Sequence, residues 1–191
     1  MTIALKHWMD IPGWCPEEEG EFLQQAVRDY AKEKIVVEIG SWCGRSASCM
    51  AEAGPKKVYC FDPYPAQSQA VTEAKSNGSG INAPLALEMM LNAVRHSNGI
   101  IILYIQSGEM GGLQWVGNKV NLLYVDGEHD SDTIKDELTA WLPHMSKDSA
   151  IIFDDYYHKQ FGPDIEIAAN GVLTDWEIHK VWGSKALWIR K

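Results

Sequence analysis

Five short apolar runs, each followed further along the chain by a segment with helical periodicity, constrain this fold more than any other feature. The runs are rich in Val, Ile and Leu and show no regular apolar–polar alternation, which is typical of strands buried on both faces of a sheet. They occupy residues 35–39, 58–61, 100–105, 120–125 and 150–153. The helical segments occupy residues 45–53, 84–96, 109–116, 132–142 and 162–174. Repeated strand–helix steps predict a parallel sheet covered by helices on both faces.

The two ends of the chain depart from this alternation. Pro16, followed by three glutamates, marks the start of a helix that precedes the first strand. The polar stretch 66–79 predicts a loop or a frayed helix. Near the C-terminus, two strand-like runs are separated by Gly183 and Ser184, a break that suits a hairpin turn. We therefore expect one domain over residues 1–191, in which 1–33 form an N-terminal lid or helix segment and 34–191 form the core.

Composition narrows the classes of partner and location. The chain has 191 residues, of which 17 are Lys or Arg and 26 are Asp or Glu, so its net charge is -9 and it shows no basic run. Nucleic acid is therefore not an expected partner. The four cysteines form no C-x-x-C pair, which favours reduced structural thiols over disulfides or a zinc site. No apolar run is long enough for a membrane span or a signal peptide, so a cytoplasmic protein is expected.

A glycine-containing turn follows the first strand. In "VVEIGSWCGRSAS", the residues Glu38, Gly40 and Gly44 follow the pattern E-x-G-x-x-x-G across a strand-to-helix turn. Glycines let a ligand approach the backbone there, and the free N–H groups of the next helix can receive an anion. Trp42 stands where a dinucleotide-binding turn needs its second glycine, which counts against NAD and an oxidoreductase. A tight turn without a ligand is the alternative that this motif leaves open.

Acidic residues end several of the predicted strands. Asp62 follows the second strand, where a carboxylate can accept hydrogen bonds from the hydroxyls of a ribose. In "NLLYVDGEHDSD" and "SAIIFDDYYH", the fourth and fifth strands end at Asp126 and at the pair Asp154 and Asp155. Carboxylates gathered at one sheet edge repel one another unless a cation lies between them, and oxygen-only clusters favour hard cations. Helix capping, or a direct contact of Asp126 with a cofactor, is the alternative.

With these motifs, the chain resembles class I S-adenosylmethionine (SAM) dependent methyltransferases. It is most similar to the family that includes macrocin-type sugar O-methyltransferases and cephalosporin-hydroxylase-like proteins, and is more distantly similar to catechol O-methyltransferases. The resemblance covers almost the whole chain, and its most specific part is the pair "VDGEH" and "FDDY". It implies a Rossmann-like fold with a mostly parallel seven-stranded sheet that ends in an antiparallel hairpin. It also implies methyl transfer from SAM to a hydroxyl of a small molecule, sugar or glycan.

The resemblance implies roles for individual residues as well. A divalent metal, usually Mg²⁺, would be held by Asp126, Asp154 and Asp155. Glu128 and His129 are the candidates for the general base, although His129 could equally orient another group. The residues expected to bind SAM are Glu38, Gly40, Ser41, Gly44, Ser46, Asp62, Ser107, Gly108, Glu109 and Asp126.

Weaker predictions concern the surroundings of this site. Trp8 and Trp14 could stack on the acceptor as part of a lid, or could pack in the core, which the pattern favours. The segment Tyr156, Tyr157, His158 and Lys159 is expected to border the acceptor pocket. A non-catalytic SAM-binding or partner-binding protein on the same fold is the alternative function, and the sequence leaves a homo-oligomer open.

Overall fold

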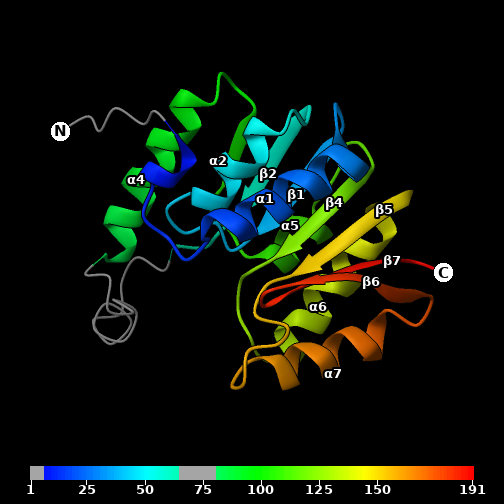
Figure 1. The fold of residues 1–191 in the computed structure, drawn as a ribbon. Helices are drawn as coiled ribbons and strands as arrows, with labels where there is room; N and C mark the ends of the chain where they lie inside the picture. Colours follow the sequence, from blue (N-terminus) through cyan, green and yellow to red (C-terminus); the bar gives the residue numbers. More distant parts are fainter. Residues whose placement is uncertain (1–6, 65–80) are drawn as a thin grey trace.

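The computed structural model describes residues 7–64 and 81–191, so the loop or frayed helix predicted at 66–79 lies outside the described residues. Within them, seven strands form one sheet in the order β3-β2-β1-β4-β5-β7-β6 (Figure 1). The strands are β1 (Ile35–Ile39), β2 (Lys57–Phe61), β3 (Ile101–Tyr104), β4 (Val120–Val125), β5 (Met145–Phe153), β6 (Trp176–Trp182) and β7 (Lys185–Arg190). Strands β1 to β5 pair in parallel, whereas β7 runs antiparallel to both β5 and β6. The predicted sheet and its C-terminal hairpin are confirmed.

Strand β5 begins earlier than the sequence predicts. Its first residue is Met145, which pairs with Val120 of β4, and the register between the two strands shifts before Leu122. The residues Ser146, Lys147 and Asp148 carry no apolar signal, so the pattern predicted only the buried part of the strand from residue 150. The pairing of Met145 with Val120, beyond the irregular register, extends the strand, and backbone pairing does not require apolar side chains at residues 146–148.

The helices cover both faces of the sheet, as the strand–helix alternation predicts. They are α1 (Glu17–Ala26), α2 (Arg45–Glu52), α4 (Ala83–His96), α5 (Gly108–Leu113), α6 (Ser131–Trp141) and α7 (Gly162–Val172), with the short helical turns η1 (Trp8–Asp10), η2 (Val27–Ala31) and η3 (Leu142–His144). Figure 1 shows α1 and α2 over one face and α6 and α7 on the other. Helix α5 is shorter than the predicted segment 109–116, because the chain turns at Gln114.

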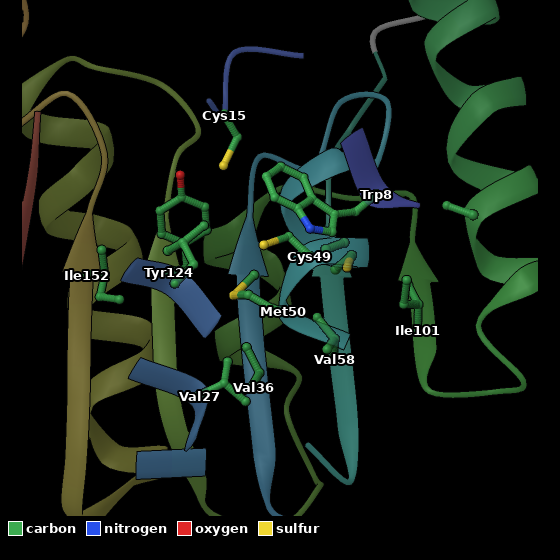
Figure 2. Close-up of a cluster of buried hydrophobic side chains, with 14 of the residues drawn as sticks. Trp8, Cys15, Val27, Val36, Cys49, Met50, Val58, Ile101, Tyr124 and Ile152 are labelled. Carbon is green, nitrogen blue, oxygen red and sulfur yellow. The ribbon is translucent and has the colours of Figure 1, made fainter. Parts of the chain in front are cut away.

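Two buried clusters lie on the two faces of the sheet. In β1, Val36 belongs to the cluster with α1, α2 and α4, and its neighbour Val37 belongs to the cluster with α6 and α7 (Figure 2 shows the first). This division follows from the pleat, which points successive side chains to opposite faces. All five residues of β1 are buried, so the strand has no solvent-facing side.

Trp8 is part of the first cluster. It is 3% exposed, and a Cβ placed on Gly20 of α1 would come within 2.3 Å of its indole ring. Core packing, the favoured alternative at the sequence level, therefore describes Trp8, and the lid role is wrong for it. Trp14 is 58% exposed.

Two further observations bear on the class of protein. The four cysteines are free and buried, as predicted for reduced structural thiols. Within residues 7–64 and 81–191, no helix is long and apolar enough to cross a membrane.

Candidate active site

The turn between β1 and α2 lies against the loop that follows β4. Gly40 has φ +82°, and a Cβ at this position would lie 2.0 Å from the carbonyl oxygen of Asp126. Gly44 has φ +86° and precedes the first residue of α2. Both positions of the motif therefore favour glycine because the backbone is left-handed there. Gly40 is also required because the backbone of Asp126 lies too close to leave room for a Cβ.

Asp62 stabilises this turn through hydrogen bonds to backbone N–H groups. Its carboxylate accepts hydrogen bonds from the backbone N–H groups of Ser41 (3.1 Å), Trp42 (2.9 Å) and Tyr64 (2.9 Å). Because an ionised carboxylate is a strong acceptor for backbone amides, Asp62 holds the end of β2 and the glycine turn together. The sequence did not indicate this role, and ribose binding by Asp62 stays a prediction.

Glu38 lies beneath the turn and is fully buried. The hydroxyl of Ser46 donates a hydrogen bond of 2.5 Å to Oε1, whereas Oε2 is buried and has no partner among the described residues. Burial raises the pKa of Glu38 to about 6, although the hydrogen bond from Ser46 and the nearby side chains of Ser41 and Cys60 oppose the shift. A buried carboxylate oxygen without a donor is an incomplete arrangement, which a donor on a bound ligand would complete.

The segment after β3 is held by packing and capping. Ser107 caps α5 by accepting a hydrogen bond from the N–H of Met110 (3.3 Å), and the indole N–H of Trp141 donates to the carbonyl of Gly108 (2.8 Å). A Cβ on Gly108 would lie 2.5 Å from Ile39. The position of Ser107 and Gly108 at the sheet edge agrees with the prediction, while their contact with a cofactor stays a prediction.

Glu137 is a buried acid beside the loops of Gly108 and Gly127, and the sequence did not indicate a role for it. It is 4% exposed, and its Oε2 atom has no partner among the described residues. Burial, together with the charges of Glu128, Asp130 and Glu109, raises the pKa of Glu137 to about 8. The signal was an acid at the spacing of Ile134, Leu138 and Trp141 on the apolar face of α6.

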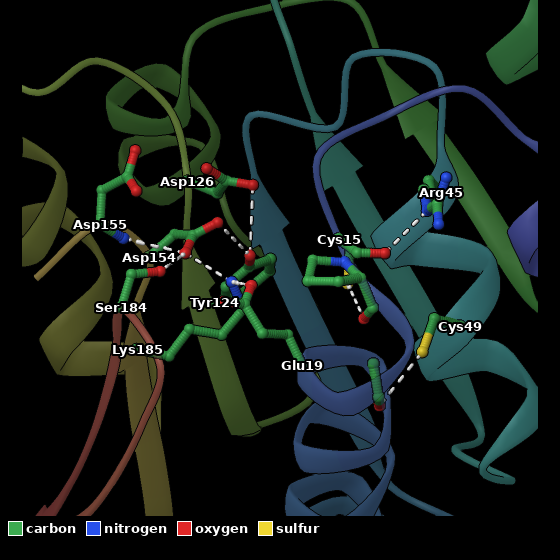
Figure 3. A network of polar contacts seen from close by, with 12 residues as sticks. Cys15, Glu19, Arg45, Cys49, Tyr124, Asp126, Asp154, Asp155, Ser184 and Lys185 are labelled. Atoms are coloured by element: carbon green, nitrogen blue, oxygen red, sulfur yellow. Dashed lines mark hydrogen bonds and ion pairs between the residues drawn. The ribbon is translucent and has the colours of Figure 1, made fainter. Parts of the chain in front are cut away.

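The acids that end β4 and β5 are joined by Tyr124. Its hydroxyl lies 2.9 Å from Oδ2 of Asp154 and 3.2 Å from Oδ2 of Asp126 (Figure 3). Burial and the nearby charge of Asp154 raise the pKa of Asp126 well above its usual range. Asp126 does not cap α6, since Asp130 does so by accepting a hydrogen bond from the N–H of Thr133.

Lys185 supplies a positive charge to this group. Its ammonium lies 2.5 Å from Oδ1 of Asp154 and 2.7 Å from Oε2 of Glu19, and the side chain is 0% exposed. The Oδ1 atom of Asp154 also accepts hydrogen bonds from the hydroxyl of Ser184 and the N–H of Asp155. Burial alone would raise the pKa of Asp154, but Lys185 outweighs it, so this pKa lies below its usual value. Nothing in the sequence indicated that Lys185 or Glu19 belongs to this group of acids.

Asp155 belongs to a different pair. Its Oδ2 atom lies 3.4 Å from Nε2 of His129, whose ring stacks on Phe161 at a centroid distance of 4.4 Å. Asp155 has φ +50°, a left-handed conformation that is unusual for a residue other than glycine and often marks functional sites. The structure thus joins His129, a predicted base, to Asp155. Glu128 is exposed on the same loop.

The three predicted metal ligands do not fit a magnesium site in this arrangement. Asp154 is occupied by Lys185, Asp155 faces His129, and in Figure 3 only the backbone N–H of Asp155 joins the Asp154 network. Among the described residues, no group of three or more His, Cys, Asp or Glu side chains is placed to hold a metal ion. Magnesium accepts only oxygen ligands in near-octahedral geometry, and an ammonium on the shared carboxylate conflicts with this requirement.

Only part of the segment 156–159, which was predicted to border the acceptor pocket, is exposed. Tyr156 is 5% exposed and its ring packs against Phe153 and Trp188, so it belongs to the core. Tyr157 is 53% exposed, and His158 and Lys159 are also exposed.

Comparison with known proteins identifies the family. A family described as a methyltransferase domain matches residues 37–156, which is more than half of the chain. The chain belongs to this family. The matched span of this methyltransferase domain contains the glycine turn and the acids that end β2, β4 and β5, but neither Glu19 nor Lys185.

Individual relatives are more distant. An uncharacterized protein of Acanthamoeba polyphaga mimivirus is 25% identical over 155 residues, which are 80% of this chain and 66%, just under two thirds, of that protein. The O-methyltransferase TomG from Streptomyces achromogenes is involved in tomaymycin synthesis and has been solved with SAM. Its TM-score is 0.65 at 14% identity, and the alignment covers 95% of this chain and 82% of the TomG chain.

Two further solved structures show the range of substrates on this fold. A TDP-rhamnose 3'-O-methyltransferase of calicheamicin biosynthesis has a TM-score of 0.62 at 16% identity and covers 92% of this chain and 81% of its own. A ribosomal protein methylase from Lactobacillus delbrueckii has a TM-score of 0.56 at 19% identity, with 92% and 80% covered. These likenesses establish a SAM-dependent methyltransferase fold and leave the acceptor open.

Proposed function

We propose that this protein transfers the methyl group of SAM to a hydroxyl oxygen of a small-molecule or sugar acceptor. The observation that carries the proposal is the buried Oε2 atom of Glu38, which has no partner among the described residues and lies beneath the glycine turn. The ammonium of the methionine part of SAM is a donor that this oxygen lacks. The methionine carboxylate would face the N-terminus of α2, where free N–H groups and the helix dipole favour an anion.

His129 and Asp155 perform the proton transfer in this proposal. The carboxylate of Asp155 lies 3.4 Å from Nε2 of His129 without a hydrogen bond between them, and its charge favours the proton on Nε2, which leaves Nδ1 to take the proton of the acceptor hydroxyl. The hydroxyl oxygen attacks the methyl carbon as the bond from that carbon to sulfur breaks. The products are a methyl ether and S-adenosylhomocysteine, and the histidine carries the proton. Glu128, exposed on the same loop, is the second candidate for this role.

The acceptor class is supported by the aromatic surface beside His129. The ring of Phe161 stacks with those of His129 (4.4 Å between centroids) and His158 (4.7 Å), and Tyr157, close by in the sequence, is 53% exposed. Flat amphipathic rings suit the faces of sugars and aromatic molecules. TomG is involved in tomaymycin synthesis and the TDP-rhamnose 3'-O-methyltransferase in calicheamicin biosynthesis, and these small-molecule pathways agree with the proposed acceptor class. We also propose one domain over residues 1–191 and a cytoplasmic location, which the free buried thiols support.

The experiment is a two-step test with SAM and a panel of acceptors. Isothermal titration should show one SAM molecule bound per chain, and Glu38→Gln should weaken binding because a neutral amide attracts the ammonium less. Methyl transfer from radiolabelled SAM would then be measured on nucleotide sugars and phenols. His129→Ala should lose transfer yet keep SAM affinity, whereas the exposed His179→Ala, on the edge strand β6, should change neither. A protein that binds no SAM is not this enzyme, and one that binds SAM but methylates no hydroxyl in a broad panel is the non-catalytic alternative.

A further inference from the structure

The acidic centre at the ends of β4 and β5 already contains a cation. The ammonium of Lys185 contacts Asp154 (2.5 Å) and Glu19 (2.7 Å) and is fully buried, whereas Lys side chains are almost never fully buried unless paired. The side chains of Asp154 and Glu19 are only 11% and 16% exposed. The pairing is therefore an internal feature of the centre and not a surface ion pair.

The register of the C-terminal hairpin brings Lys185 to this place. Phe153 pairs with Ala186 in the antiparallel β5–β7 pair, so residue 185 lies beside residue 154 at the strand end. The turn before it has Gly183 at φ +57°, and a Cβ there would lie 2.7 Å from Oε1 of Glu19. A side chain at residue 183 would push the carboxylate of Glu19 away from this position, which the glycine avoids.

Three acids surround the ammonium of Lys185. It contacts Asp154 and Glu19 directly, and Asp126 is connected to Asp154 through the hydroxyl of Tyr124. The ammonium of Lys185 binds Oδ1 of Asp154, which also accepts hydrogen bonds from Ser184 and from the N–H of Asp155. A divalent ion could bind this oxygen only by displacing the covalently attached ammonium of Lys185.

We propose that Lys185 is the built-in cation of this centre and takes the place of the divalent metal ion that the family resemblance implies. It neutralises Asp154, fixes the direction of its carboxylate and ties the centre to α1 through Glu19. The centre then binds no divalent ion of its own, and removal of the lysine ammonium leaves the carboxylates of Asp154 and Glu19 together without a counter-ion, which a divalent cation can then neutralise. Only the consequence for turnover, which is transfer without added metal, rests on the proposed function.

The test measures Mn²⁺ binding directly, by titration calorimetry and by the paramagnetic resonance signal of free Mn²⁺. The proteins are the wild type, Lys185→Met, the double variant Lys185→Met/Asp154→Asn, and Lys147→Met, a control that removes an exposed lysine from the opposite end of β5. The wild type and the control should show no saturable site. Lys185→Met should bind one Mn²⁺ per chain with a dissociation constant at least tenfold below the highest Mn²⁺ concentration at which the wild type shows no binding, and the double variant should lose that site.

The outcome can be decided even if Lys185→Met does not fold. Saturable Mn²⁺ binding by the wild type that disappears in Asp154→Asn would overturn the proposal, because a metal would then displace the lysine. A folded Lys185→Met protein that binds no Mn²⁺ would also overturn it. Absence of Mn²⁺ binding by the wild type, with SAM affinity unchanged in excess chelator, supports it. Failure to bind SAM at all would refute the proposed function. The Mn²⁺ measurements would still decide whether Lys185 takes the place of a divalent ion.

Discussion

The clearest quantitative prediction concerns Glu137→Gln on the buried face of α6. Glu137 is 4% exposed, with the acids Glu128, Asp130 and Glu109 as its charged neighbours, and its pKa is raised from 4.5 to about 8. Glutamine has nearly the same shape but carries no ionisable group. The substitution therefore removes the cost of holding a charge in this place and changes packing little.

The expected size follows from the pKa of Glu137. A group whose pKa is raised in the folded state contributes stability below its unfolded value, and this contribution is lost as the pH rises through the folded value. Here the loss extends from pH 4.5 to about pH 8. Each pH unit within that window corresponds to about 1.4 kcal/mol. The wild type should therefore lose about 3.5 kcal/mol relative to Glu137→Gln between pH 5 and pH 8, slightly less than three full units because the slope falls near the folded pKa.

The assay is urea denaturation of both proteins at several pH values between 5 and 8. The difference in unfolding free energy should grow steadily in favour of Glu137→Gln, while the titration of Glu38, which both proteins share, cancels in the difference. Asp136→Asn is the matched control, since Asp136 is the exposed neighbour on the same helix, and its difference from the wild type should stay nearly constant. A pH-independent difference for Glu137→Gln would refute the assigned electrostatic cost.

Three other predictions concern the glycine turn and the base. Gly40→Ala should destabilise the protein by at least about 2 kcal/mol in urea denaturation, because its Cβ would meet the carbonyl of Asp126 at 2.0 Å in addition to the left-handed strain. Gly54→Ala shares that strain, with φ +87° and nothing within 4 Å, so it should cost only about 1 to 2 kcal/mol; equal costs would contradict the close approach. Asp62→Ala should weaken SAM binding in calorimetry by about tenfold or more, because the turn amides lose their charged acceptor; unchanged affinity would show that the turn holds its shape alone. His129→Ala should lower kcat by about 10² to 10⁴ with little change in the dissociation constant of SAM, and full activity would exclude it as the base.

The sequence predicted the framework of the site well. Buried strands and the Gly183–Ser184 turn produce local patterns, so the parallel sheet and its hairpin were predictable before any contact was known. Residues at the ends of parallel strands must meet at one sheet edge, and Glu38, Asp62, Asp126 and Asp154 are found there. Individual roles were less predictable: Asp62 holds a turn, and Tyr156 packs in the core.

The sequence by itself determined which acids stand at the strand ends, because strand periodicity and length are local properties of the chain. Only the tertiary structure decided what charge those acids face. Glu19 and Lys185 are 166 residues apart, and no spacing rule connects an N-terminal helix to the first residue of the last strand. The antiparallel register of β7 and the packing of α1 bring Glu19 and Lys185 together. The buried ammonium of Lys185 therefore lies where the carboxylates alone had suggested a metal ion.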